Sequence, residues 1–139
     1  MNVTFTRRYF FSASHRLDCA ALSPEENRNV YGKCNNPHGH GHNYRLEVSV
    51  RGPVDRATGM VMNMADLDAV VGKSVVERFH LANLNMDLLF QQEVPTTENL
   101  CRAIHRLLAQ ELPAGRLDRI RIEETENNFF EYAGEGTRG

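Results

Sequence analysis

The segment from His42 to Gly52 alternates strictly between apolar and polar side chains. From Tyr44 to Val50 every second position is aromatic or aliphatic, and the positions between them are polar or charged. A period of two is typical of a β-strand that buries one face and exposes the other. The segment therefore predicts a sheet with an apolar face that needs cover.

The remaining elements follow from residue preference and periodicity. They are a strand over 3–13, a long loop over 18–39 with one helical turn from Pro24, helices that begin near Asn63 and after Thr97, and strands over 117–125 and 129–133. β-Branched and aromatic residues favour the strands, and apolar residues three or four positions apart favour the helices. This order predicts an α+β fold with a four-stranded antiparallel sheet and two helices inserted between strands two and three.

Composition narrows the class of protein. The chain of 139 residues has the length of one domain over 1–139, and its 16 basic and 18 acidic residues give a net charge of −2, which does not favour nucleic-acid binding. It has no apolar run of membrane-spanning length and no signal-peptide pattern at its start, so we expect a cytoplasmic protein without a membrane partner. Its three widely spaced cysteines fit neither a disulfide framework nor a four-cysteine zinc site.

Three histidines form a candidate metal site. His40 and His42 open the alternating strand, and side chains two positions apart project to the same side. His15 ends the first strand, and it reaches the same place if the two strands pair across the long loop. Three imidazoles leave one coordination position open, which is the pattern of catalytic Zn²⁺. We read His38 as a solvated loop residue and His105 as a surface imidazole.

A thiol and a carboxylate accompany these histidines. Cys34 lies six positions before His40, and a thiol near zinc would have a lowered pKa suited to a general base or nucleophile. The alternative is a small buried apolar residue. Glu124 shares a face with Ile120 and Ile122, where an unpaired carboxylate is costly. A ligand with adjacent N–H donors would satisfy it, unless Glu124 lies beyond the sheet edge in water.

Six motifs together resemble the signature of the 6-pyruvoyl-tetrahydropterin synthase family, over about residues 3–135. They are Phe11-Ser12-Ala13-Ser14-His15-Arg16, Gly32-Lys33-Cys34-Asn35-Asn36-Pro37, Gly39-His40-Gly41-His42-Asn43-Tyr44, the run 55–63 (DRATGMVMN), Thr96-Thr97-Glu98-Asn99 and Glu124-Thr125-Glu126-Asn127-Asn128. The resemblance implies a tunnelling fold, in which the sheets of three subunits form a barrel and two trimers stack into a homohexamer.

The resemblance also implies the site and the reaction. Zinc would be held by His15, His40 and His42, and Cys34 would act as general base. Glu124 would anchor the pterin ring, helped by Thr96 and Thr97 of a neighbouring subunit. The family converts 7,8-dihydroneopterin triphosphate to 6-pyruvoyl-tetrahydropterin with loss of triphosphate, a carbon–oxygen lyase reaction. Arg16 and Lys33 are the nearest basic candidates for the triphosphate.

One departure from the family pattern leaves alternatives open. The family's Asp-His pair, which belongs to the proton relay, corresponds here to His80 and Leu81, and leucine cannot transfer a proton. His80 replaces the relay or only packs beside Phe79. The alternatives to the pyruvoyl enzyme are a related lyase that makes 6-carboxy-tetrahydropterin for queuosine or cleaves the dihydroneopterin side chain, and a pterin-binding protein with weak or no turnover. The spacing of six from Cys34 to His40 resembles the pyruvoyl enzyme, since the 6-carboxy enzymes usually have four.

Overall fold

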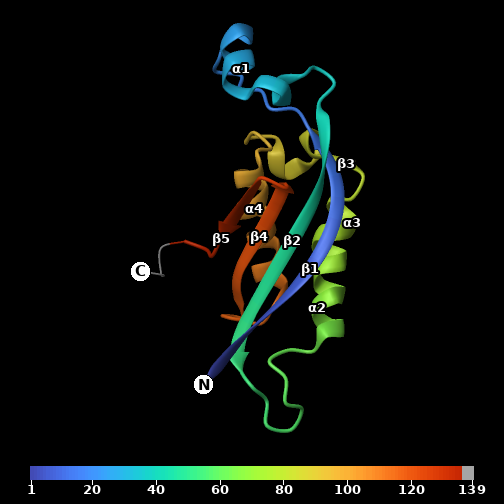
Figure 1. Cartoon of the computed structure of the whole chain (residues 1–139), viewed down its shortest axis with the longest axis vertical. Helices are drawn as coiled ribbons and strands as arrows, with labels where there is room; N and C mark the ends of the chain where they lie inside the picture. Colours follow the sequence, from blue (N-terminus) through green and yellow to red (C-terminus); the bar gives the residue numbers. More distant parts are fainter. Residues whose placement is uncertain (136–139) are drawn as a thin grey trace.

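A long antiparallel hairpin forms the centre of the sheet. In the computed structural model, which describes residues 1–135, β1 (Asn2–His15) and β2 (His40–Pro53) pair along their whole length. The pairing runs from Asn2 opposite Pro53 to His15 opposite His40. The predicted hairpin across the long loop is therefore confirmed, and both strands extend a few residues beyond their predicted bounds (Figure 1).

The complete sheet has five strands in the order β3-β1-β2-β4-β5. β4 (Leu117–Thr125) and β5 (Asn128–Tyr132) continue the antiparallel sheet, as predicted, whereas β3 (Ala82–Asn83) pairs parallel to β1. The α+β class is confirmed, but the prediction of four antiparallel strands is wrong. A strand of two residues has no periodicity by which the sequence could reveal it.

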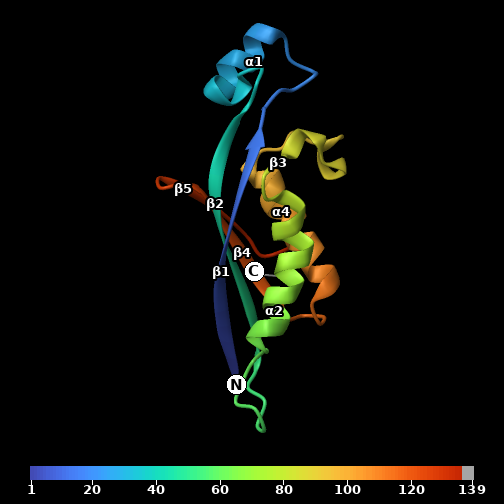
Figure 2. The ribbon, with the colours of Figure 1, turned by 90° about the vertical axis from the view of Figure 1, so that its right-hand side faces the viewer.

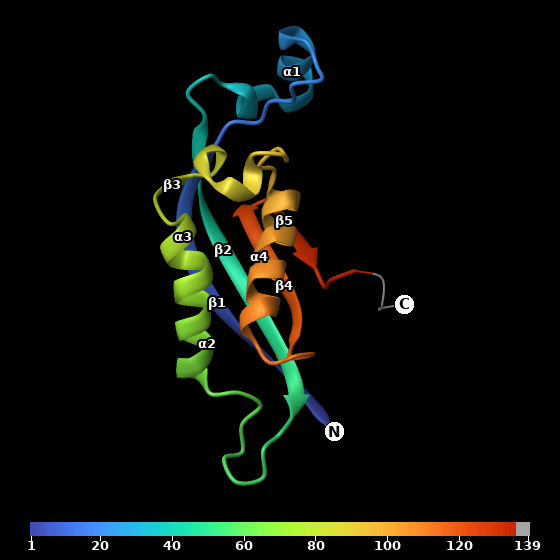
Figure 3. The ribbon, with the colours of Figure 1, turned by 180° about the vertical axis from the view of Figure 1, so that it is seen from behind.

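Helices cover one face of the sheet and enclose the core between the two layers (Figures 2 and 3). α2 (Met64–Val71) continues through a π-helical turn, η2 (Gly72–Val76), into α3 (Glu77–Phe79), and α4 (Thr97–Glu111) lies beside this rod. Asn63 caps α2 as predicted, and Thr96 caps α4. The core joins the two layers through Tyr44, Leu46, Val48, Leu67, Val71, Leu100, Ile104, Ile120 and Ile122.

The connection between β1 and β2 projects beyond the end of the sheet (Figure 1). It contains α1 (Pro24–Tyr31) and the 3₁₀ turn η1 (Gly32–Asn35), so the helix is longer than the single turn that the sequence predicted. Ser23 and Glu26 form a reciprocal capping box, which satisfies amide groups at the start of α1 and explains this length. Two further 3₁₀ turns, η3 (Leu84–Met86) and η4 (Leu88–Phe90), lead to α4.

Within residues 1–135, no helix is both long enough and apolar enough to cross a bilayer.

Candidate metal centre

Three imidazoles converge where the central hairpin opens into the long connection. The ring centroid of His15 lies 5.3 Å from that of His40 and 5.1 Å from that of His42. The centroids of His40 and His42 are 4.6 Å apart. The register explains this arrangement, because His15 pairs with His40 and Ala13 pairs with His42. The expected gathering of the three histidines is thus present in a single chain.

His15 is held in the orientation of a metal ligand. Its side chain is buried, and Nδ1 lies 2.9 Å from the carbonyl oxygen of Pro95, which only accepts hydrogen bonds. Nδ1 therefore carries the proton, and the lone pair of Nε2 is directed elsewhere. Within residues 1–135, Nε2 of His15 is buried without a hydrogen-bond partner. A ring fixed through one nitrogen while the other remains available is the usual second-sphere arrangement of ligating histidines.

His40 and His42 bring their nitrogens to the same point. Their Nε2 atoms lie 2.9 Å apart, and burial lowers the pKa of both His15 and His42 below the ordinary 6.5. Neutral imidazole is the form that binds a metal. Two groups of residues each bring their donor atoms within 4.8 Å of one another. The first group is His15, Cys34 and His40, and the second is His15, His42 and Glu124. The chemistry and the orphaned nitrogen of His15 both fit Zn²⁺.

Cys34 adjoins the imidazoles, as expected, but its surroundings do not by themselves favour the thiolate. Its Sγ lies 3.6 Å from Nε2 of His40. Burial raises the pKa of the thiol above the ordinary 9.0, and the negative charge of Glu124 raises it further. The sequence predicted a lowered pKa for a thiol beside a metal ion. Since a nearby cation favours thiolate, a bound ion would oppose both of these effects.

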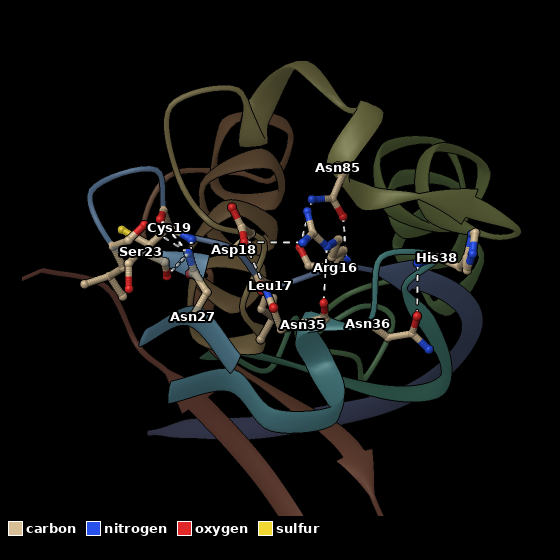
Figure 4. A network of polar contacts seen from close by, with 11 residues as sticks. Arg16, Leu17, Asp18, Cys19, Ser23, Asn27, Asn35, Asn36, His38 and Asn85 are labelled. Carbon is tan, nitrogen blue, oxygen red and sulfur yellow. Dashed lines mark hydrogen bonds and ion pairs between the residues drawn. The ribbon is translucent and has the colours of Figure 1, made fainter. Parts of the chain in front are cut away.

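A polar network fixes the turn that carries Cys34 (Figure 4). The Leu17 amide donates to the Cys34 carbonyl at 2.7 Å, and Nδ2 of the buried Asn35 donates to the Leu17 carbonyl at 2.8 Å. Arg16 contributes Nε to the Asn35 carbonyl, and both of its backbone groups bond to the side chain of Asn85. The position of the thiol is thus set by the segment that follows His15.

Glu124 lies beside the same centre on the helix-covered face. The hydroxyl of the buried Thr97 donates to one carboxylate oxygen, and Asn128 Nδ2 lies 3.4 Å from the other. The β4–β5 register shifts between Glu123 and Thr125, and such a bulge redirects the side chain within it. Glu124 is therefore partly buried and hydrogen-bonded.

The two threonines behave differently from each other. Thr96 accepts the Asn99 amide as the cap of α4, while Thr97 bonds to Glu124 of its own chain. The resemblance implied that both threonines come from a neighbouring subunit. The Thr97–Glu124 contact shows that one of them already reaches the carboxylate within a single chain.

The structure does not bring His80 to Cys34 within the described part of one chain. His80 is exposed at the end of α3, and its Nδ1 accepts the Ser12 amide at 3.1 Å. Leu81 follows with a φ of 61° and a side chain that is 80% exposed. A leucine in the left-handed region is uncommon and points to a constrained backbone at this position.

The two remaining histidines, His38 and His105, differ in their exposure to solvent. His38 is exposed, as predicted. His105 is half-buried against the ring of Tyr132, with centroids 5.0 Å apart, so its prediction as a surface imidazole is wrong.

Sequence reasoning missed one residue near the centre. A cleft of about 590 Å³ beside the imidazoles is lined by His40, His42, Lys33 and Arg28, among others. Lys33 was a candidate from its place in the sequence, whereas Arg28 was not considered. Its position in the last turn of α1, five residues before Lys33, could have indicated it once the helix was recognised.

Comparisons with known proteins identify the family of this chain. The profile of the family described as 6-pyruvoyl tetrahydropterin synthase matches residues 4–135. The human 6-pyruvoyl tetrahydrobiopterin synthase is 48% identical over 94% of this chain and 90% of its own length, and the Dictyostelium discoideum protein of the same name is 45% identical over 96% and 97%. The structure of Caenorhabditis elegans 6-pyruvoyl tetrahydropterin synthase superposes with a TM-score of 0.91 at 38% identity and covers 97% of both chains. The chain therefore belongs to the 6-pyruvoyl tetrahydropterin synthase family and is an enzyme of the lyase class.

Proposed function

We propose that this chain is a zinc-dependent lyase that converts 7,8-dihydroneopterin triphosphate to 6-pyruvoyl-tetrahydropterin with loss of triphosphate. The observation that carries the proposal is the convergence of three imidazoles, a thiol and a partly buried carboxylate at one end of the β1–β2 hairpin. The similarity to synthases of this name over nearly the whole chain supports the reaction type.

The residues present fit a zinc ion with an open position. His15, His40 and His42 would hold it, and Cys34 would remain outside the ligand set as a base. Bound zinc supplies Lewis acidity toward the hydroxyl oxygens of the substrate side chain, which acidifies the neighbouring C–H bonds. The hydrogen bond from His15 to Pro95 keeps the first of these rings in its ligating tautomer.

Cys34 and Glu124 divide the work on the substrate. Cys34 as thiolate removes a carbon-bound proton of the side chain, and the thiol so formed is available to return a proton to the pterin ring. Glu124 accepts the adjacent N–H groups of the pterin, which orients the ring and satisfies the carboxylate. Thr97 supports Glu124 by donating to its second oxygen.

The direct test is product analysis. Zinc-loaded protein is incubated with 7,8-dihydroneopterin triphosphate, and products are followed by mass spectrometry, with Cys34→Ala as the matched inactive variant. The proposal expects 6-pyruvoyl-tetrahydropterin and released triphosphate from the parent protein only. Formation of 6-carboxy-tetrahydropterin or of a side-chain cleavage product would assign the chain to a related reaction.

A second candidate function is pterin binding with weak turnover. It is favoured by one observation, that the exposed Leu81 stands where the family carries a proton-transferring residue. His80→Ala separates the candidates, because a relay through His80 predicts loss of turnover with unchanged pterin affinity. Unchanged turnover in this variant would exclude His80 from the relay.

We further propose assembly into a homohexamer of two stacked trimers. β5 is the last strand of its sheet, and β1 is paired on its outer side only at Ala13 and Ser14 among the described residues. Open edges of this kind accept strands from other copies. The mass of the particle, measured by light scattering after gel filtration, tests the proposal.

A further inference from the structure

We propose that Arg28 and Lys33 form an anion-binding arm that holds the triphosphate of the substrate at the mouth of the metal centre. The inference rests on the proposed function and assigns a place to the leaving group. Both residues belong to the connection between β1 and β2, with Arg28 in α1 and Lys33 in η1.

The cleft that they line opens directly onto the metal centre. Its volume of about 590 Å³ lies in the range of small-molecule sites, and His40 and His42 form part of its wall. A substrate whose side chain reaches the imidazoles has its phosphate end in the same space. The remaining lining residues carry no charge: Gly32, Asn35, Asn36 and Pro37.

This cleft contains no carboxylate, which separates it from three other charged clefts among residues 1–135. The cleft between Lys73 and Arg78 also contains Asp87 and Glu111, and the cleft at Arg102 and Arg106 contains Glu135. Three arginines on the open sheet face share their cleft with Glu47 and Glu123. Two cations and no carboxylate line the cleft at the metal centre, although the whole chain is net negative. Such a cleft attracts anions.

Arg28 and Lys33 are free to serve a ligand, whereas Arg16 is not. Neither of the two side chains has a hydrogen bond or ion pair within the described residues. Arg16, the other basic candidate near the centre, donates to the Asn35 carbonyl at 3.3 Å and lies 3.5 Å from Asp18 (Figure 4). Its guanidinium therefore stabilises the turn at Cys34. The pair at Arg28 and Lys33 remains for the phosphates.

The two side chains suit a polyphosphate in different ways. A guanidinium donates two parallel hydrogen bonds to a phosphate, and an ammonium acts as a mobile point charge. Both side chains are exposed, so each contact is screened by solvent and salt. We expect each neutral substitution to weaken triphosphate binding about three- to tenfold.

The test is calorimetric titration of inorganic tripolyphosphate into protein stripped of zinc, so that chelation of the metal does not contribute. Arg28→Gln and Lys33→Gln should each raise Kd, and the double variant should also lose most of the salt dependence. The matched control is Arg56→Gln, which removes the same charge from the exposed turn at the opposite end of the hairpin and should leave Kd unchanged. Equal affinity of the parent and the double variant would overturn the inference.

A second titration separates this inference from the proposed function. 7,8-Dihydroneopterin lacks the phosphates, and its affinity should be the same in the parent and the double variant. If the double variant loses affinity for it to the same degree as for tripolyphosphate, the arm does not recognise phosphate and the inference fails. If the parent binds tripolyphosphate through this arm but no pterin, the proposed function fails while the anion site stands.

Discussion

Two polar clusters lie on the helix-covered face of the same hairpin, several residues apart along β1. In the first, Asp68 of α2 accepts hydrogen bonds from Arg7 at 2.7 Å and 3.1 Å and from Tyr9 at 2.8 Å. In the second, the nitrogens of His15, His40 and His42 face one another, and within the described residues Nε2 of His15 and Nδ1 of His40 have no partner.

The difference distinguishes structure from function. In the Asp68 cluster both carboxylate oxygens accept hydrogen bonds from side chains of β1, so the cluster holds α2 to the sheet without a further partner. The histidine cluster instead leaves the lone pair of the buried Nε2 of His15 without a donor among the described residues, and such a lone pair is available to a cation. Unbalanced donors and acceptors, rather than polarity itself, mark the site.

The largest effect is expected for Cys34→Ala. If Cys34 is the base, kcat for the lyase reaction falls by about 10²–10⁴-fold, while zinc and pterin affinity are kept. Cys19→Ala is the matched control, since Cys19 is also a half-buried free thiol. Activity of Cys34→Ala close to that of the parent would remove Cys34 from the mechanism.

A smaller loss is expected for Glu124→Gln. Replacing the carboxylate weakens charge-assisted hydrogen bonds to the pterin, and we expect its Kd to rise about tenfold to a hundredfold. Fluorescence titration with a pterin measures this. Glu123→Gln, on the opposite face of β4 in an ion pair with Arg45, is the control. Equal losses in both variants would contradict the anchoring role of Glu124.

Asn35→Ala tests the turn that positions the thiol. It leaves the Leu17 carbonyl without its donor, and we expect the free energy of unfolding to fall by about 1–3 kcal/mol in urea titrations. Asn36→Ala, an exposed neighbour, should cost much less. A positioning role also predicts that the rate of alkylation of Cys34 changes in Asn35→Ala and stays constant in Asn36→Ala.

The smallest effect is expected in the satisfied cluster. The hydrogen bonds from Arg7 and Tyr9 hold the pKa of Asp68 below the ordinary 3.8. The contribution of Asp68 to stability is therefore present above that value and is lost as the pH falls through the pKa of the folded state. Asp68→Asn should show a shallower loss of stability between about pH 5 and about pH 2. An unchanged acid limb in urea titrations would contradict this assignment.

The sequence predicted the hairpin and its histidines because both depend on local rules. The alternation after His42 sets the face of every side chain on β2, and pairing with β1 then brings in His15. β3 was not predictable, since two residues held beside β1 by the Leu81 amide bond to Ser12 leave no pattern. The sequence predicted a single turn at α1, although the spacing of Ser23 and Glu26 is that of a capping box, which indicates the start of a longer helix.

The orientation of Glu124 illustrates a limit of pattern reasoning. Alternation placed it on the apolar side, but the alternative of a wet residue past the sheet edge stayed open. The bulge in β4 and the contact with Thr97 make Glu124 partly buried, and both depend on where α4 meets β4. The periodicity of a sequence does not predict tertiary contacts of this kind.

The most direct test of the account is a comparison of zinc affinity in His42→Ala and Cys34→Ala, measured by competition with a chromogenic chelator. Both residues adjoin the centre: Cys34 belongs to the donor set with His15 and His40, and His42 belongs to the set with His15 and Glu124. If three histidines hold zinc, His42→Ala weakens binding by about a hundredfold or more. Cys34→Ala and the exposed control His38→Ala then bind zinc like the parent. Loss of zinc in Cys34→Ala with full retention in His42→Ala would contradict the account and make the thiol a ligand rather than the base.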